Sequence, residues 1–126
     1  MNFTGTPINI CSSEVQNRLY NSSYYNSVYY SGVSNVVFGG QSLREYSYTG
    51  SASVDFYFYN SPGSTPQVYD VVDYSSLCSA TKIKMVIDGG YCTSGKLVTL
   101  NIAGTNYFRF CDVQVGGNSY HGEFSR

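Results

Sequence analysis

The sequence predicts an all-β protein: a single-domain antiparallel β-sandwich of jelly-roll or Ig-like type with about eight or nine short strands. Apolar and polar residues alternate along many short segments, which is the pattern of strands that bury one face. Turn-forming residues separate these segments at roughly 8–12-residue spacing. The chain also contains 14 Tyr and 7 Phe, which favour strands. Its 126 residues fit one domain, 1–126.

The N-terminal region is predicted to differ from the rest of the chain. Residues 1–12 are expected to form an extended arm, because Pro7 disfavours a helix there. Residues 13–20 are expected to form one short helix, since Ser13 and Gln16 have the spacing of a weak capping box. Every other regular element is predicted to be a strand.

The middle of the chain contains the clearest predicted hairpin. Residues 42–60 are expected to turn at Thr49 and Gly50, and Val54 and Phe56 share the apolar face of the second strand. The polar side chains of that strand, with its tyrosines, face solvent. The strands of this region are predicted at 24–30, 33–38, 42–48, 51–60 and 67–74.

Residues 81–115 are predicted to form a three-stranded meander in which consecutive strands pair. A three-residue turn at 103–105 would place Val98 opposite Phe110, so that both face the core. Past Phe110 the alternation reverses at Asp112, which indicates either a bulge or a strand end covered on both faces. The strands are predicted at 81–87, 96–102 and 106–115, followed by a last strand at 119–124.

The four cysteines lack the C-x-x-C spacing of zinc and redox motifs. In the predicted meander, Cys78 and Cys92 lie at opposite ends of one strand, on the order of 23 Å apart. Cys111 is distant from both, and a disulfide requires Cα atoms within about 7 Å. We therefore expect mostly free thiols, with Cys11 joined to at most one partner, and folding in a reducing compartment.

Composition excludes several classes of partner. The net charge is −1 and only 12% of the residues are charged, so neither nucleic acid nor an anionic membrane is an expected partner. No run of about 18 apolar residues exists, so no membrane-spanning helix is expected. The N-terminus lacks the basic and apolar regions of a signal peptide, so we expect either no leader or one that has been removed.

The sequence offers no convincing catalytic arrangement. Ser119, His121 and Glu123 alternate on one predicted strand, but neighbours two apart point the same way, about 6.5–7 Å from each other. Carboxylates that could hydrolyse a glycoside or hold calcium, such as Asp55 and Asp88, fall on separate elements. We expect no enzymatic activity, no cofactor and no metal.

Tyrosines supply the predicted contact surface. They give rigid contact area that combines an apolar ring with a hydroxyl, and they are frequent in binding hot spots. The alternative is ordinary cross-strand packing. The candidates are Tyr46, Tyr48, Tyr57 and Tyr59 on the hairpin, and Tyr24, Tyr25, Tyr29 and Tyr30 near the N-terminal arm.

No motif assigns the chain to a family, but its composition resembles that of small virion proteins of tailed phages and of β-rich filament subunits. The resemblance implies a non-enzymatic decoration, fibre or tail-accessory subunit that binds copies of itself or other virion proteins. Such a subunit folds in a reducing cytoplasm and ends in a virion or an extracellular assembly. The alternative is a secreted carbohydrate-binding or adhesin module, with a glycan as its partner and with disulfides.

Overall fold

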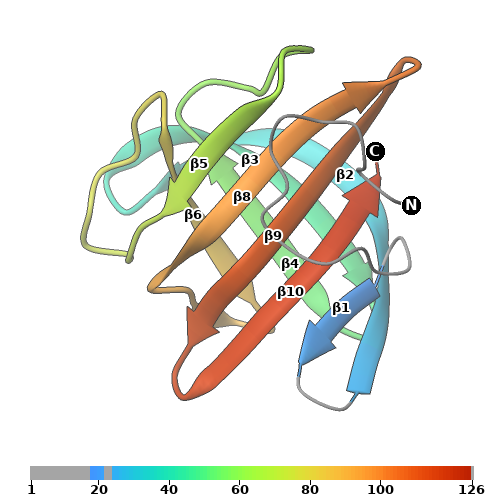
Figure 1. Ribbon diagram of the computed structural model, residues 1–126. Coiled ribbons are helices and arrows are strands. Elements are labelled where there is room, and N and C mark those ends of the chain that lie inside the picture. The colour runs from blue at the N-terminus through green and yellow to red at the C-terminus, as the bar shows by residue number, and fades with distance from the viewer. Residues whose placement is uncertain (1–17, 22–23, 126) are drawn as a thin grey trace.

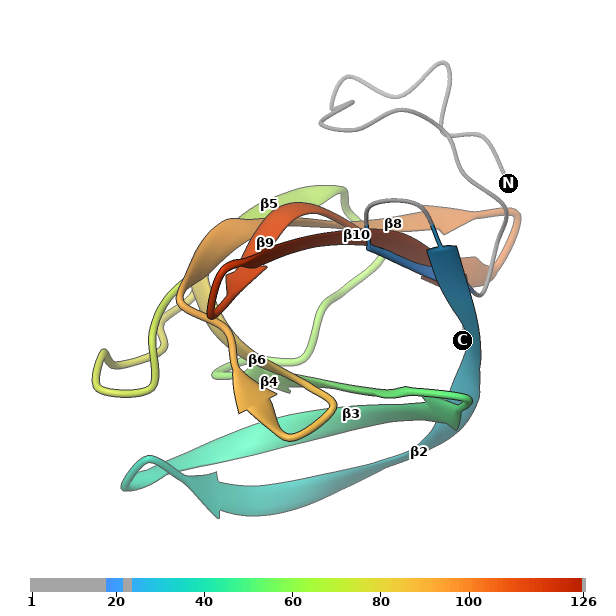
Figure 2. The ribbon, with the colours of Figure 1, turned by 90° about the horizontal axis from the view of Figure 1, so that it is seen from below.

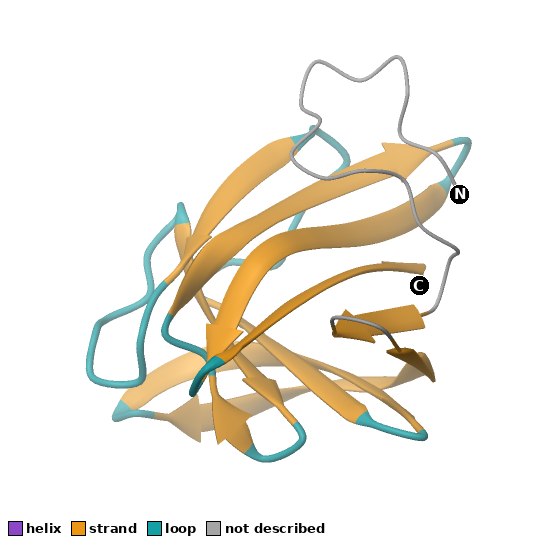
Figure 3. Cartoon of the chain, turned by 60° about the horizontal axis from the view of Figure 1, so that its bottom comes forward, coloured by secondary structure: helices purple, strands orange, loops and turns teal. Residues whose placement is uncertain are grey.

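The structure, a computed structural model, describes residues 18–21 and 24–125. Every regular element in this part of the chain is a strand (Figure 1), so the predicted all-β class is confirmed. Loops and turns join the strands at their ends (Figure 3). The strands are β1 (Arg18–Asn21), β2 (Tyr24–Phe38), β3 (Gln41–Gly50), β4 (Ser53–Phe58), β5 (Gln67–Val71), β6 (Lys82–Ile87), β7 (Gly90–Tyr91), β8 (Ser94–Ile102), β9 (Thr105–Val115) and β10 (Asn118–Ser125).

All ten strands belong to one curled sheet, in the order β4-β3-β2-β1-β10-β9-β8-β5-β6-β7. β4 also pairs with β6, so the sheet returns on itself and its strands face each other across a shared interior (Figure 2). β5 and β6 run parallel, whereas the other pairs of described strands are antiparallel. The protein is therefore a curled mixed sheet, and the predicted two-sheet antiparallel sandwich is not confirmed.

The first described strands correct two predictions. Residues 24–30 and 33–38 form one strand, β2, in which the extra residue Ser31 forms a bulge against β3. Residues 18–20 of the predicted helix lie in β1, because Leu19 is buried in the core and the segment pairs with both β2 and β10. The rest of that helix and the arm over 1–12 lie outside the described residues.

The hairpin predicted at 42–60 is confirmed as β3 and β4, with Thr49 opposite Ser53. Val54, Phe56 and Phe58 are fully buried in the main core, as their alternation indicates. The rings of Phe56 and Phe58 pack against phenylalanines of β9 and β10 across the interior.

The meander predicted at 81–115 is wrong in its first pairing. β6 does not pair with β8, because β5 lies between them and pairs with both. The opposite edge of β6 pairs with β4, so that Phe56 lies opposite Met85. β6 is buried on both faces: Ile83 and Met85 face the main core, and Val86 packs in a smaller cluster on the outer side.

The hairpin of β8 and β9 has a register one residue away from the predicted one. Its turn contains two residues, Ala103 and Gly104, both with positive φ as a type I′ turn requires. Leu97 therefore lies opposite Phe110 and faces the main core. Val98 faces the other way, into a second cluster with Leu100 and Tyr107.

The irregularity predicted near Asp112 is a bulge. Asp112 has a φ of 52°, and β9 contains one extra residue there relative to both β8 and β10. The bulge restores the alternation, so Val113 returns to the main core and Val115 packs against it.

Candidate functional site

Two of the predicted contact tyrosines are core residues. Tyr46 and Tyr48 point into the interior, where their rings lie 5.4 and 6.1 Å from that of Phe108. They project from β3 on the same face as the buried residues of β4, which is why they are covered. The prediction that they lie on a contact face is therefore wrong.

The other tyrosines occupy different surroundings. Tyr57 is buried on the outer side of β4, so the prediction that it faces solvent on a contact face is wrong, whereas Tyr59 follows β4 and is 53% exposed. Tyr29 and Tyr30 lie on β2 and are 57% and 39% exposed. Residues 24 and 25 belong to β2, but their side chains lie outside the described part of the structure.

Tyr57 belongs to an aromatic cluster on the outer side of the sheet, which the sequence did not indicate. It stacks on Phe38 at 3.9 Å between ring centroids, and Tyr74 stacks on Tyr91 beside them at 4.6 Å. The Lys84 ammonium lies beneath, 5.2 Å from the Tyr74 ring and 5.9 Å from the Phe38 ring. These contacts cover the buried lysine with aromatic faces that attract a cation.

Burial in this region raises the pKa of two acidic groups. It raises the pKa of the Tyr57 hydroxyl, and a hydrogen bond with Glu45 raises it further. Burial also raises the pKa of the Asp55 carboxyl, while a hydrogen bond with Ser47 lowers it and the charge of Glu45 raises it. Burial first, and then the nearby carboxylates, keep the hydroxyl of Tyr57 protonated.

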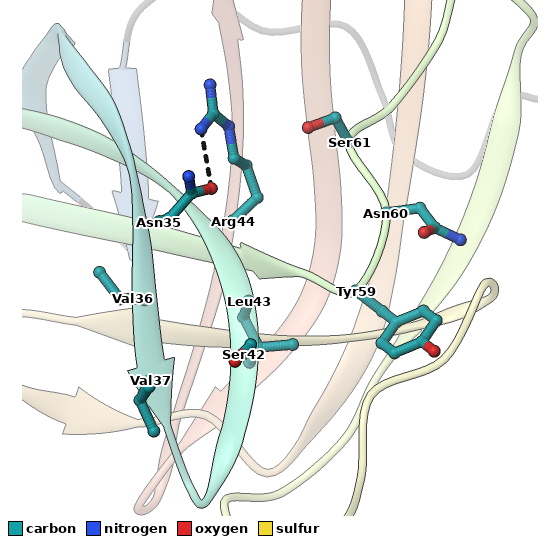
Figure 4. Close-up of a pocket in the computed structure, with 9 residues that line it drawn as sticks. All are labelled: Asn35, Val36, Val37, Ser42, Leu43, Arg44, Tyr59, Asn60 and Ser61. Atoms are coloured by element: carbon teal, nitrogen blue, oxygen red, sulfur yellow. Dashed lines mark hydrogen bonds between the residues drawn. The ribbon is translucent and has the colours of Figure 1, made fainter.

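A pocket of about 440 Å³ opens where β4 leaves β3. β4 stays paired with β3 as far as Phe58, which lies opposite Arg44, and the chain then diverges. Figure 4 shows the pocket between the β2–β3 hairpin and residues 59–61, with the Arg44 and Ser61 side chains on opposite sides of it. Arg44 Nη1 donates a hydrogen bond to Asn35 Oδ1 at 2.8 Å.

The open edge of β2, residues 28–38, is a second candidate site. One edge of this segment pairs with β3. On the other edge of β2, β1 pairs with residues 24–27, which precede the segment. No strand within the described ranges pairs with the remainder of that edge. The whole of β2 contains neither a charged residue nor a proline, and Val37 is 76% exposed.

The cysteines follow the prediction in part. Cys78 and Cys92 are free and buried, whereas Cys111 is disulfide-bonded. The expectation of mostly free thiols holds for Cys78 and Cys92, and the bond at Cys111 agrees with the one disulfide that this expectation allowed. Burial raises the pKa of both free thiols, that of Cys92 to about 12.

Cys78 and Cys92 should consequently resist alkylation in the folded protein. A thiol reacts as the thiolate, and at pH 8 both groups are protonated and covered. Mass spectrometry after treatment with iodoacetamide should show almost no modification of either residue in buffer and full modification of both in denaturant. Rapid labelling of either one in the folded protein would contradict this assignment.

The sequence Ser119-Tyr120-His121-Gly122-Glu123 does not form a triad. Ser119 is exposed and His121 half-buried, whereas Glu123 is buried and lies directly opposite Arg109 of β9. Within the described residues no three His, Cys, Asp or Glu side chains form a group that could hold a metal ion. The same part of the chain contains no helix with the length and apolarity needed to cross a membrane.

The candidate sites are thus the open edge of β2 and the adjoining pocket, and Asn35 and Val37 belong to both. Sequence reasoning named unpaired sheet edges in general terms but missed the pocket. Comparison with protein-family models, curated proteins and solved structures finds no match to this chain.

Proposed function

We propose that this protein is a non-enzymatic structural subunit that self-associates through the open edge of β2. The observation that carries the proposal is that no strand within residues 18–21 and 24–125 pairs with this edge. An unpaired strand exposes a row of N–H and C=O groups that can pair with another chain. Soluble proteins usually protect such edges with lysine, proline or a bulge.

Of these three protections, β2 has only a bulge, which lies near its middle. The bulge at Ser31 leaves Gly32 to Phe38 as a regular segment beyond it. This segment carries polar uncharged and apolar side chains, among them the exposed Ser34 and Val37. Its composition is suited to strand pairing, which takes its affinity from main-chain hydrogen bonds and its specificity from alternate side chains.

A second copy of the chain is the partner that this edge fits. Two β2 strands can pair antiparallel about a twofold axis, so that each contributes the same residues. No charge on either strand opposes the approach of the other. An assembly built in this way suits a structural subunit of a virion, such as a decoration, fibre or tail-accessory protein, or of a similar β-rich assembly.

Light scattering coupled to size-exclusion chromatography tests the proposal. The measured mass should rise with concentration from that of the 13.9 kDa chain to that of a dimer or a larger assembly. A mass that stays at the monomer value up to millimolar concentration would overturn the proposal.

A lysine on the edge should block the association. In Ser34→Lys the new ammonium lies opposite Glu45 of β3, which the fold tolerates, but two such strands bring like charges together. We expect the dissociation constant to rise at least about tenfold. Ser64→Lys, which adds the same charge to an exposed loop, is the matched control and should associate normally. Equal association of both variants would show that β2 is not the interface.

A further inference from the structure

The pocket beside β3 has a lining with one positive charge and no negative charge. Arg44 is its charged residue, and the other polar groups are amides and hydroxyls. Glu45, the carboxylate next in sequence, lies on the other face of β3, where it contacts Tyr57. Within the described residues, Arg44 has Asn35 as its hydrogen-bond partner and forms no ion pair with a carboxylate.

The hydrogen bond to Asn35 fixes one end of the guanidinium and leaves further N–H groups for a ligand. The two residues lie directly opposite one another on β2 and β3, so the amide orients the arginine from the neighbouring strand. A guanidinium presents its N–H groups in a planar fork that matches a carboxylate. The guanidinium of Arg44 carries one positive charge and the amide of Asn35 is neutral, so the pair suits a ligand group with one negative charge.

The rest of the lining suits a ligand rich in hydroxyl groups. Asn35, Ser42 and Ser61 carry amides and hydroxyls that both donate and accept hydrogen bonds, as ligand hydroxyls do. β3 continues beyond its last pair with β4, so Ser42 has no partner in β4. Val37 and the half-exposed Tyr59 ring add apolar surface at the rim.

We infer that this pocket binds a sugar residue that carries a carboxylate, such as a uronic acid. The carboxylate binds Arg44 and the ring hydroxyls bind the amides and serines. The volume of about 440 Å³ falls within the range of roughly 300–1,000 Å³ that small-molecule sites occupy. This binding requires only one copy of the chain, although Asn35 and Val37 belong both to the pocket and to the open edge of β2.

Titration of the ¹⁵N-labelled protein with methyl β-D-glucuronide, followed by NMR, tests the inference. Amide signals of Asn35, Ser42, Arg44 and Ser61 should shift in a saturable manner. Methyl β-D-glucoside, which has a hydroxymethyl group in place of the carboxylate, should bind at least about tenfold more weakly. Acetate should also bind more weakly, because it lacks the hydroxyls.

The other outcomes overturn the inference in distinguishable ways. No shift with the glucuronide excludes the site, and equal affinity for the glucoside excludes a role for the carboxylate. Equal or tighter binding of acetate or inorganic phosphate shows an anion site without sugar specificity.

Variants assign the binding to the pocket. Arg44→Gln should weaken glucuronide binding at least about tenfold and leave the weak glucoside binding unchanged. Tyr59→Ala should weaken the binding of both the glucuronide and the glucoside. Because Tyr59 is exposed, this variant keeps the test valid if Arg44→Gln does not fold. Tyr91→Ala removes an equally exposed ring outside the pocket and should bind normally. Normal glucuronide binding by both Arg44→Gln and Tyr59→Ala would refute the assignment.

Discussion

Replacement of Phe108 by alanine is expected to lower the free energy of unfolding by about 3–5 kcal/mol. Phe108 is 1% exposed and lies at the centre of the aromatic core. Its ring centroid is 5.1 Å from that of Phe56 and 5.5 Å from that of Phe58, and it also contacts two buried tyrosines of β3. Because four rings of β3 and β4 pack against it, the cavity left by alanine cannot close easily.

Urea denaturation followed by circular dichroism measures this change. Tyr29→Ala removes a ring that is 57% exposed, and its effect should stay within about 0.5 kcal/mol. Phe108→Leu keeps most of the side-chain volume, so its loss of unfolding free energy should lie between those of Phe108→Ala and Tyr29→Ala. An effect of Phe108→Ala as small as that of Tyr29→Ala would mean that the two sides of the curled sheet do not pack as described.

Replacement of Glu123 by glutamine is expected to lower the free energy of unfolding by a similar amount, about 3–5 kcal/mol. Glu123 and Arg109 are both buried and lie directly opposite one another on β10 and β9. The substitution keeps the size of the side chain but removes the negative charge from the strand position opposite the buried Arg109, and a buried charge that loses a compensating charge is costly.

A double-mutant cycle separates the charge effect from packing. Arg109→Met combined with Glu123→Leu removes both charges, and such replacements are often close to neutral. The double variant should therefore be more stable than either single variant, Arg109→Met or Glu123→Leu, when unfolding is measured in urea. Additive losses from the two sites would show that their charges are not coupled.

The early hairpin could be predicted because its pattern is local. In β4 the apolar residues alternate with polar ones, and the turn lies next to them in sequence, so the faces of Val54 and Phe56 follow directly. The bulge at Asp112 could be placed for the same reason, since the alternation reverses at that residue.

The register of β8 and β9 could not be predicted, because β8 is apolar on both faces. Leu97 faces the main core and Val98 a second cluster, so alternation fits either register. The insertion of β5 between β6 and β8 is a long-range pairing, and no local signal encodes it. The buried run of β6 is equally compatible with strands on either side.

The candidate site was harder to predict than the fold. A tyrosine is amphipathic, so Tyr48 in the core and Tyr29 on the surface occur in similar sequence surroundings. The pocket combines Arg44 with residues 59–61, which are brought together only where β4 leaves β3. Sequence did indicate unpaired edges, but only the structure shows which edge of β2 is open.

Amide hydrogen exchange at two protein concentrations tests the assembly interface most directly. If the open edge of β2 pairs with a second copy, amides between Gly32 and Phe38 should exchange several-fold more slowly in the concentrated sample. Amides of β9, which pairs with β8 and β10 inside one chain, should exchange at the same rate in both samples. Identical exchange of the β2 amides at both concentrations, in a sample that light scattering shows to be associated, would contradict pairing through this edge.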